Sequence, residues 1–297
     1  MTSSKLKFDS RPDLQGGRLV LSFTGWMDGG DVSSGTVQGL VDELLAVQVA
    51  EIDSEGFYIF NFPGDMQSSA LFRPHIKIEE GIVKRFEIPS NLFFASESHK
   101  LAFFLGKEPN LRWREFGQCI FDFAEELGLS SIVFVGSFAG SVPHTREPRL
   151  HVSVSMPHLR EKLQKLGLRP TNYEGPGSFM TYLTTQATQR GVEMANIAAE
   201  IPAYVNGTNP SSIEAVTRRL AAILELEVDL SRLRSESNQW ESRVSEIVED
   251  DSDLKQQVRE LEEQYDDELI GSGQQGTDGG LGLFDVDNTA NTDPDKD

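Results

Sequence analysis

The first 46 residues show the pattern of a strand, a glycine-rich turn and a helix. Arg18–Thr24 is a run of apolar and β-branched residues that ends at Gly25, which is typical of a buried strand. Apolar residues then recur at helical spacing up to about Ala46, and Asp31 or Ser33 is the expected N-cap of this helix. This order of elements predicts the opening of a βαβ unit.

Further strands and helices follow along the next 155 or so residues at spacings typical of an α/β domain. Strand-like runs lie at 47–53, 57–62, 76–80, 82–88, 91–95, 131–135 and near 192–199, and helical patterns lie at 110–127, 156–167 and 178–190. Only one residue separates the runs 76–80 and 82–88, which predicts a hairpin and therefore a mixed sheet. We expect a three-layer α/β/α core domain over residues 1–210.

The character of the sequence changes after Pro210. Ser211 and Ser212 are the predicted caps of a helix, and a heptad-like seam follows within 211–270. The seam residues are Trp240, Val244, Ile247, Leu254, Val258, Leu261 and Tyr265, with Asp251 interrupting. Two readings stay open: the helices fold back on the body or on each other, or they form an intermolecular coiled coil that holds an oligomer together.

Residues 271–297 form a predicted disordered, acidic tail. They are rich in Gly, Asp, Asn, Gln and Thr, so they bury too little apolar surface to order themselves. Their one apolar island, Leu281-Gly282-Leu283-Phe284, is either incidental or a short docking motif.

The charge and cysteine content narrow the classes of partner and compartment. The net charge is −20, and the excess of acidic residues lies mainly in the C-terminal third. That region would repel a phosphate backbone, so we expect no nucleic-acid partner. The single cysteine, Cys119, lies in an apolar stretch, and we expect it to be a small buried apolar residue. With no long apolar run and no signal peptide, we expect a cytoplasmic protein without a membrane partner.

Three loops concentrate the residues that offer chemistry. Trp26 and Asp28 lie in the glycine loop after the first strand, but the spacing is neither that of a dinucleotide fingerprint nor that of a P-loop. The stretch 136–146 follows a buried strand, where open α/β sheets bind ligands, and Phe138 stands where a nucleophile elbow needs serine. Glu174 precedes a Gly-Pro turn and is a candidate acid or base. These loops predict no complete catalytic set, metal site or cofactor.

The loops occur in an ordered set that resembles the proteasome assembly chaperone 2 (PAC2) family. The set is Gly25-Trp26-x-Asp28, Arg73-Pro74, Gly106-x-Glu108-Pro109 with Trp113, Val142-Pro143-His144-Thr145-Arg146 and Tyr173-x-Gly175-Pro176. The resemblance covers about residues 15–225 and points to the bacterial, actinobacterial-type branch with a C-terminal helical extension. It implies a nucleoside-phosphorylase-like core and self-association into a homo-oligomer. For eukaryotic and archaeal relatives it also implies chaperoning of proteasome particles.

The hypothesis we favour is a non-enzymatic interaction or assembly factor with a chaperone-like role. The alternative is a small-molecule-binding protein or an enzyme, of the nucleoside, phosphate or ligase type, that uses the phosphorylase-like core. Its candidate ligand-binding residues are Trp26, Asp28, Arg73, Gly136, His144, Thr145, Arg146 and Glu174. The chain ends in Asp293-Pro294-Asp295-Lys296-Asp297, without the hydrophobic-Tyr-x ending of relatives that dock on a proteasome, which argues against that mode of docking.

Overall fold

The computed structural model describes residues 4–70 and 72–275, and side chains up to residue 270. The large sheet has nine strands in the order β1-β3-β6-β7-β2-β8-β11-β9-β10, and β4 and β5 form a separate two-stranded sheet. The strands are β1 (Leu6–Phe8), β2 (Arg18–Thr24), β3 (Val47–Ile52), β4 (His75–Glu79), β5 (Ile82–Glu87), β6 (Leu92–Ser96), β7 (Leu101–Lys107), β8 (Ser131–Gly140), β9 (Leu150–Val154), β10 (Arg169–Pro170) and β11 (Glu193–Pro202).

The helices of the described residues alternate with these strands in the first two thirds of the chain and dominate the last third. They are α1 (Val32–Glu43), α2 (Met66–Ala70), α3 (Trp113–Glu126), α4 (Pro157–Gln164), α5 (Phe179–Arg190), α6 (Pro210–Leu224), α7 (Ser231–Asp250) and α8 (Ser252–Gln275), with 3-10 turns at η1 (Gly29–Asp31) and η2 (Glu97–His99). Most of the predicted disordered tail, including the island at 281–284, lies outside the described residues.

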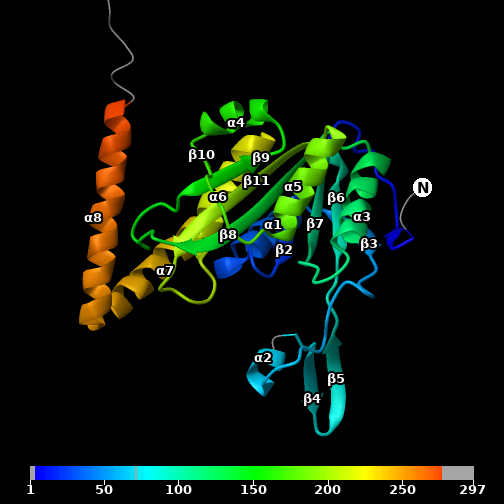
Figure 1. Ribbon diagram of the computed structural model, residues 1–297, viewed down its shortest axis with the longest axis horizontal. Helices are drawn as coiled ribbons and strands as arrows, with labels where there is room; N and C mark the ends of the chain where they lie inside the picture. Colours follow the sequence, from blue (N-terminus) through cyan, green and yellow to red (C-terminus); the bar gives the residue numbers. More distant parts are fainter. Residues whose placement is uncertain (1–3, 71, 276–297) are drawn as a thin grey trace, which may run out of the picture.

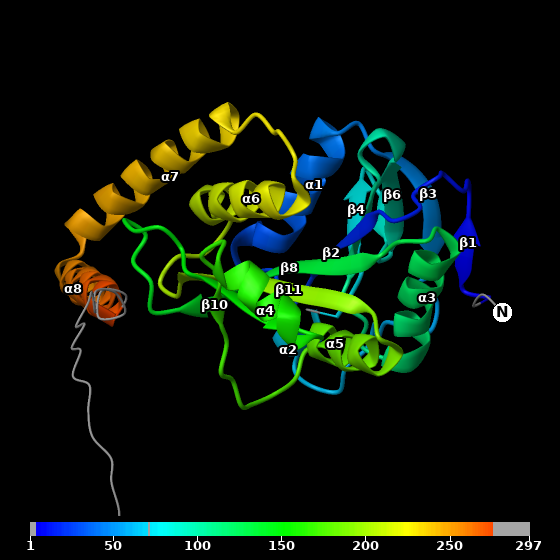
Figure 2. The same ribbon diagram turned by 90° about the horizontal axis from the view of Figure 1, so that it is seen from above.

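Helices cover both faces of the large sheet, which confirms the predicted three-layer α/β core with a mixed sheet. The four central strands β7, β2, β8 and β11 run parallel, and antiparallel strands flank them. Helices α3 and α5 lie on one face, and α1 and α6 lie on the other (Figures 1 and 2). The expected resemblance to nucleoside phosphorylases stays a prediction.

Each face of the sheet has its own hydrophobic core. The core under α3 and α5 is rich in phenylalanine, and Phe93 stacks on Phe123 with ring centroids 3.8 Å apart. Cys119 is fully buried in this core, as its apolar setting predicts. The core under α1 and α6 is mainly aliphatic, with Phe103 as its buried aromatic member, and includes residues of both helices and of the strands beneath them. Burial of these two layers fixes the register of the central strands.

Two local predictions differ from the structure, and one strand was not predicted. Residues 57–62 form an irregular segment instead of a strand, and the carbonyl of the buried Phe57 accepts the N–H groups of Asn110 and Leu111. Leu101–Lys107 is a central strand that the sequence analysis did not identify. The second buried strand does not end at residue 135: β8 continues to Gly140 and pairs with β11 throughout.

The C-terminal helices fold back on the body of this chain, as the first of the two readings predicts. Asn209, rather than Ser211 or Ser212, caps α6, and its side chain accepts the Ser212 N–H at 2.9 Å. Helix α6 packs on α1, α7 packs on α6, and α8 on α7 (Figure 2). The division of the chain at residue 210 stays a prediction.

The predicted heptad seam is only partly buried. Its members Trp240, Val244, Val258 and Tyr265 are buried, but Ile247 is 65% exposed and Val248 is buried in its place. The chain is extended at Asp251 between α7 and α8, which breaks the helical repeat between the two halves of the seam.

Candidate functional site

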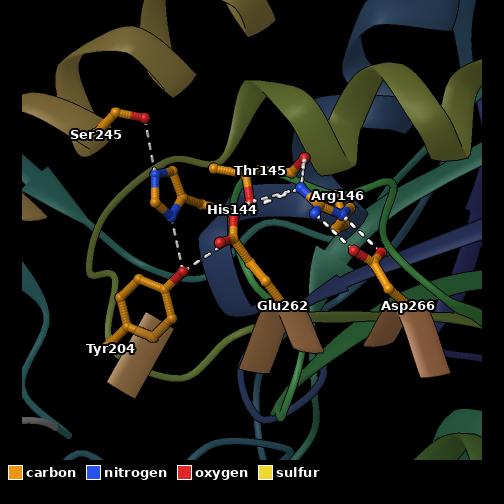
Figure 3. A network of polar contacts seen from close by, with 7 residues as sticks. All are labelled: His144, Thr145, Arg146, Tyr204, Ser245, Glu262 and Asp266. Carbon is orange, nitrogen blue, oxygen red and sulfur yellow. Dashed lines mark hydrogen bonds and ion pairs between the residues drawn. The ribbon is translucent and has the colours of Figure 1, made fainter. Parts of the chain in front are cut away.

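His144 joins the loop after β8 to helix α7. Its side chain is 97% covered, and its backbone N–H donates to Tyr204 Oη at 2.8 Å. Burial raises the pKa of Tyr204 to about 12, so its hydroxyl stays protonated at neutral pH, and it hydrogen-bonds with His144 Nδ1 at 2.7 Å. The other ring nitrogen, Nε2, hydrogen-bonds with Ser245 Oγ of α7 at 3.0 Å (Figure 3). Burial lowers the pKa of His144, more than the nearby Glu262 raises it, which favours the neutral imidazole.

Thr145 and Arg146 bind helix α8 in the same way (Figure 3). Thr145 Oγ1 donates to Glu262. The guanidinium of Arg146 makes two bonds to Asp266, from Nε at 2.9 Å and from Nη2 at 2.8 Å. Hydrogen bonding between these two groups raises the pKa of Arg146 and lowers that of Asp266. The three consecutive side chains predicted to bind a ligand are therefore occupied by α7 and α8.

Arg149 extends this contact toward the sheet, and the sequence analysis missed it. Its side chain is almost buried, with Nη2 2.9 Å from Glu268 of α8 and Nη1 3.7 Å from Glu200 of β11. The guanidinium also lies 4.6 Å from the ring centre of Tyr265, whose hydroxyl donates to the Glu147 carbonyl at 2.9 Å. The residues of α8 that make these contacts lie at helical spacing, at positions 262, 265, 266 and 268. This spacing was the one signal in the sequence that α8 has a face that contacts the body.

Asp28 and Gly136 serve the packing of the parallel strands and α1. Asp28 Oδ1 accepts the Ser34 N–H at 3.0 Å, and Oδ2 accepts the Ser34 hydroxyl at 2.7 Å, so the carboxylate caps the first turn of α1. Burial raises its pKa despite these bonds. A β-carbon at Gly136 would lie 2.6 Å from the Phe134 ring and 3.1 Å from the Met27 carbonyl. Gly136 is thus part of a strand, not of a loop as the sequence analysis expected.

The candidate residues do not converge on a single pocket. Arg73 lies beside a groove at the base of the β4–β5 hairpin and donates to Asn61 Oδ1 at 3.1 Å. His144 and Arg146 are enclosed against α7 and α8, far along the chain from that groove. Glu174 is exposed in the loop before α5. It lines neither this groove nor the cavity beneath the loop 171–178. The convergent pocket on which the enzyme alternative depended is absent from the described residues.

A cavity of about 490 Å³ lies between the sheet and the loop 171–178. Its floor comes from β8, β9 and β11, and its lining includes Trp26, Phe138, His151, Tyr173, Asn196 and Glu200. Of the predicted ligand residues, only Trp26 lines it. His151, Asn196 and Glu200 were missed because the sequence does not show which side chains of three strands share one face.

The β4–β5 hairpin extends from the body on its own (Figure 1). In its register Ile76 faces Phe86 and Ile78 faces Val83, and Lys84 is the extra residue of a bulge between them. The bulge brings Val83 and Phe86 onto the same side as the two isoleucines. All four side chains are exposed. We call these four residues the apolar face of the hairpin.

The other side of the hairpin is mainly charged. Lys77 faces Arg85 and His75 faces Glu87, while the exposed Ile82 faces Glu79 near the turn. Arg85 Nε lies 2.5 Å from Glu87 Oε1, and Lys77 Nζ lies 2.7 Å from Glu79 Oε1. A groove of about 670 Å³ at the base of the hairpin separates it from α1 and includes Phe60, Phe72 and Arg73 in its lining. The hairpin is therefore amphipathic, with one apolar and one charged side.

Among residues 4–70 and 72–275, no group of three or more His, Cys, Asp or Glu side chains is placed to hold a metal ion. None of the helices in that part of the chain is long and apolar enough to cross a membrane.

Comparison with known proteins identifies the family. The model of the PAC2 family matches residues 22–248. The chain belongs to the PAC2 family. Among solved structures, a PAC2 family protein from Streptomyces avermitilis is 27% identical, with a TM-score of 0.68, over 82% of this chain and 99% of that one. A proteasome-assembly chaperone homologue from Mycobacterium tuberculosis is 26% identical, with a TM-score of 0.70, over 81% and 99%. Both sources are actinobacteria, in agreement with the branch that the motifs indicate.

Other solved structures share the fold of this chain at lower sequence identity. PbaB from Pyrococcus furiosus, described as an archaeal proteasome activator, shares the PAC2 fold with 19% identity and a TM-score of 0.61, over 83% of this chain and 99% of that one. No curated protein matches the chain. The motifs that carried the resemblance thus include packing positions of the fold such as Asp28, and positions that anchor the C-terminal helices such as His144 and Arg146.

Proposed function

We propose that this PAC2 protein is a non-enzymatic protein-interaction or assembly factor, chaperone-like in role, that binds its partner through the β4–β5 hairpin. The observation that supports this is the exposed apolar face of Ile76, Ile78, Val83 and Phe86. An isolated two-stranded hairpin is marginally stable in water, and contiguous exposed apolar surface is typical of interaction sites. The hairpin therefore gains stability when another apolar surface covers it.

The occupant that fits is an apolar surface of another polypeptide. The charged side of the hairpin carries both signs, in the pairs Lys77–Glu79 and Arg85–Glu87, and these remain solvated while the apolar side is covered. The groove at its base has Phe60 and Phe72 in its lining, so further aromatic side chains lie beside the hairpin. A core of aromatic and aliphatic side chains with a charged rim is the usual composition of a protein interface.

The relatives suggest where such a partner belongs. Two of the similar structures are named for proteasome assembly or activation, and a proteasome particle is one partner class that the hairpin would fit. A second copy of this chain is another, in line with the expected homo-oligomer. We also propose a cytoplasmic location, because the single cysteine is buried and cannot form an intramolecular disulfide. We assign no catalytic residue.

The test is affinity capture with face-specific variants. Ile78→Thr with Phe86→Thr places strand-favouring Thr at two positions of the apolar face and removes its two largest contributions to the exposed apolar surface. Lys77→Thr with Arg85→Thr makes the matched change on the charged side. We expect the wild type and the charged-side variant to retain the same protein, at levels within twofold, and the apolar-face variant to lose at least 90% of it. Equal recovery by both variants would refute docking through the apolar face.

The choice of partner class follows from the same experiment. Recovery of proteasome subunits, or of a second, differently tagged copy of this chain, identifies which of the two expected occupants covers the hairpin. If no protein is retained by the wild type after cross-linking in cells, the interaction function itself is wrong.

A further inference from the structure

The cavity beneath the loop 171–178 has the position of a ligand site. It lies toward the carboxyl ends of the parallel strands β8 and β11, where open α/β sheets bind ligands. On the sheet floor Ala198 lies between Asn196 and Glu200 in the alternation of β11, and its short side chain leaves the space above it open. Its volume of about 490 Å³ falls within the range of about 300–1,000 Å³ that small-molecule sites occupy.

Aromatic side chains from three separate segments form its walls. Trp26 comes from the loop after β2, Phe138 from β8, and Tyr173 from the loop before α5. Trp26 is 58% exposed and Tyr173 is 67% exposed, although both border the cavity. Aromatic rings held open at the mouth of a cavity offer flat faces on which another ring stacks. The shape of the site therefore favours a planar ligand.

The polar groups of the floor are suited to the edge of a heterocycle. Asn196 Nδ2 donates to Ser153 Oγ at 3.1 Å and to Thr184 Oγ1 at 2.6 Å. Its amide oxygen, Oδ1, is buried and has no hydrogen-bond partner among the described residues. An unpaired buried acceptor is destabilising, and a donor on a ligand would relieve this cost. Ser153 accepts the Asn196 bond, so its own hydroxyl hydrogen remains for an acceptor on the same ligand.

The charges exclude an anion. His151 and the Ser141 N–H hold the pKa of Glu200 below its usual range, so the carboxylate is ionised at neutral pH. No Lys or Arg of the described residues lines the cavity. A phosphate or carboxylate ligand would lie beside this carboxylate, with no Lys or Arg in the lining to pair with it. The carboxylate is itself already satisfied, by Ser141 at 2.8 Å, His151 at 3.3 Å and Arg149 at 3.7 Å, so a cation gains no free partner.

We propose that the cavity binds an uncharged, planar nitrogen heterocycle, with its ring between the exposed aromatic side chains and an N–H group directed to Asn196. The ligand pairs with the amide oxygen of Asn196 and with the Ser153 hydroxyl, and Glu200 rejects phosphorylated forms of the same ring. This site is independent of the docking function of the hairpin, because the two share no lining residue.

The experiment is a calorimetric titration of the full chain with adenine, cytosine and nicotinamide, each compared with its 5′-monophosphate nucleotide. We expect saturable binding of at least one free base with a Kd below about 1 mM, and binding of its nucleotide at least tenfold weaker. Tyr173→Ala removes one exposed wall, and Ala198→Leu fills the floor, so each is expected to weaken binding of the base at least tenfold.

Matched controls separate a filled site from a damaged fold. Ala139→Leu places the same added volume at an exposed position of β8, and we expect its affinity for the base to stay within twofold of the wild type. The hairpin variant Ile78→Thr with Phe86→Thr must also bind the base normally. If none of the three bases binds, or if the nucleotide binds as tightly as its base, the proposal is wrong. Unchanged affinity in both Tyr173→Ala and Ala198→Leu would place any binding elsewhere and equally overturn it.

Discussion

Replacing Trp240 with alanine is expected to undock α7 and α8 while the sheet stays folded. Trp240 is 6% exposed and belongs to a small core with Val244, Val248 and Val258, separate from the two cores of the sheet. Its ring also meets His144 edge-on, with centroids 6.4 Å apart. Because this small core has few other members, loss of its largest side chain should destabilise the packing of α7 and α8 rather than the whole domain.

The magnitude follows from the buried surface. A buried tryptophan covers about 200 Å² of surface, which at about 25 cal/mol per Å² gives about 5 kcal/mol. Partial collapse of the remaining valines reduces this, and measured Trp→Ala changes of about 3–5 kcal/mol set the expected range. At the lower end, about 3 kcal/mol corresponds to a more than 100-fold larger population of the undocked state.

Hydrogen–deuterium exchange read by mass spectrometry measures this directly. In Trp240→Ala we expect protection of α7 and α8 to fall about 100-fold, while β8 and β11 keep theirs. Ile247→Ala, on the same helix but 65% exposed, is the matched control and should change stability by less than about 0.5 kcal/mol. The reasoning is refuted if α7 and α8 keep their protection in Trp240→Ala, or if the sheet loses protection to the same extent.

Three further predictions concern single polar residues. Burial raises the pKa of Asp28 above its usual 3.8, so the stability gained from the protonated carboxyl is lost as the pH rises through the folded-state pKa. Asp28→Asn should therefore have a higher melting temperature than the wild type at pH 7, and the difference should disappear toward pH 4. Burial lowers the pKa of His144 below its usual 6.5, so the unfolded chain takes up the proton first and stability should fall as the pH drops below 6.5; His144→Gln should flatten that slope in urea titrations at several pH values. Asn209→Ala removes the acceptor of the Ser212 N–H and should cost about 0.5–2 kcal/mol in chemical denaturation, with Asn209→Asp retaining most of the stability.

The elements that the sequence predicts well are those whose pattern is local. Helix α3 shows apolar residues at helical spacing over its length, and Ser178 caps α5 by accepting the Thr181 N–H, as its position before the helix predicts. The hairpin of β4 and β5 was also predicted, from two strand patterns around Gly81. In each case the deciding interactions lie within a few residues, so a single sequence contains them.

The elements that were missed depend on distant partners. β8 continues through Gly136 to Gly140 because β11, some sixty residues later, supplies its backbone partners, and glycine propensity alone favours a turn there. The loop with His144 and Arg146 has the composition of a ligand site, but its partners are Ser245 and Asp266, more than a hundred residues away. The composition of this loop therefore did not show whether its polar side chains would bind a ligand or a helix of the same chain.

The most direct test of the account is site-specific photo-cross-linking from the two sides of the hairpin in cells. A benzophenone amino acid at Phe86 lies on the apolar face, and the same residue at Arg85 lies on the charged side. We expect a discrete protein adduct from position 86, either with a partner or with a second copy of this chain, and at least fivefold less of it from position 85. Equal adducts from both positions, or none from position 86, would contradict the proposal that the apolar face of the hairpin is the docking surface.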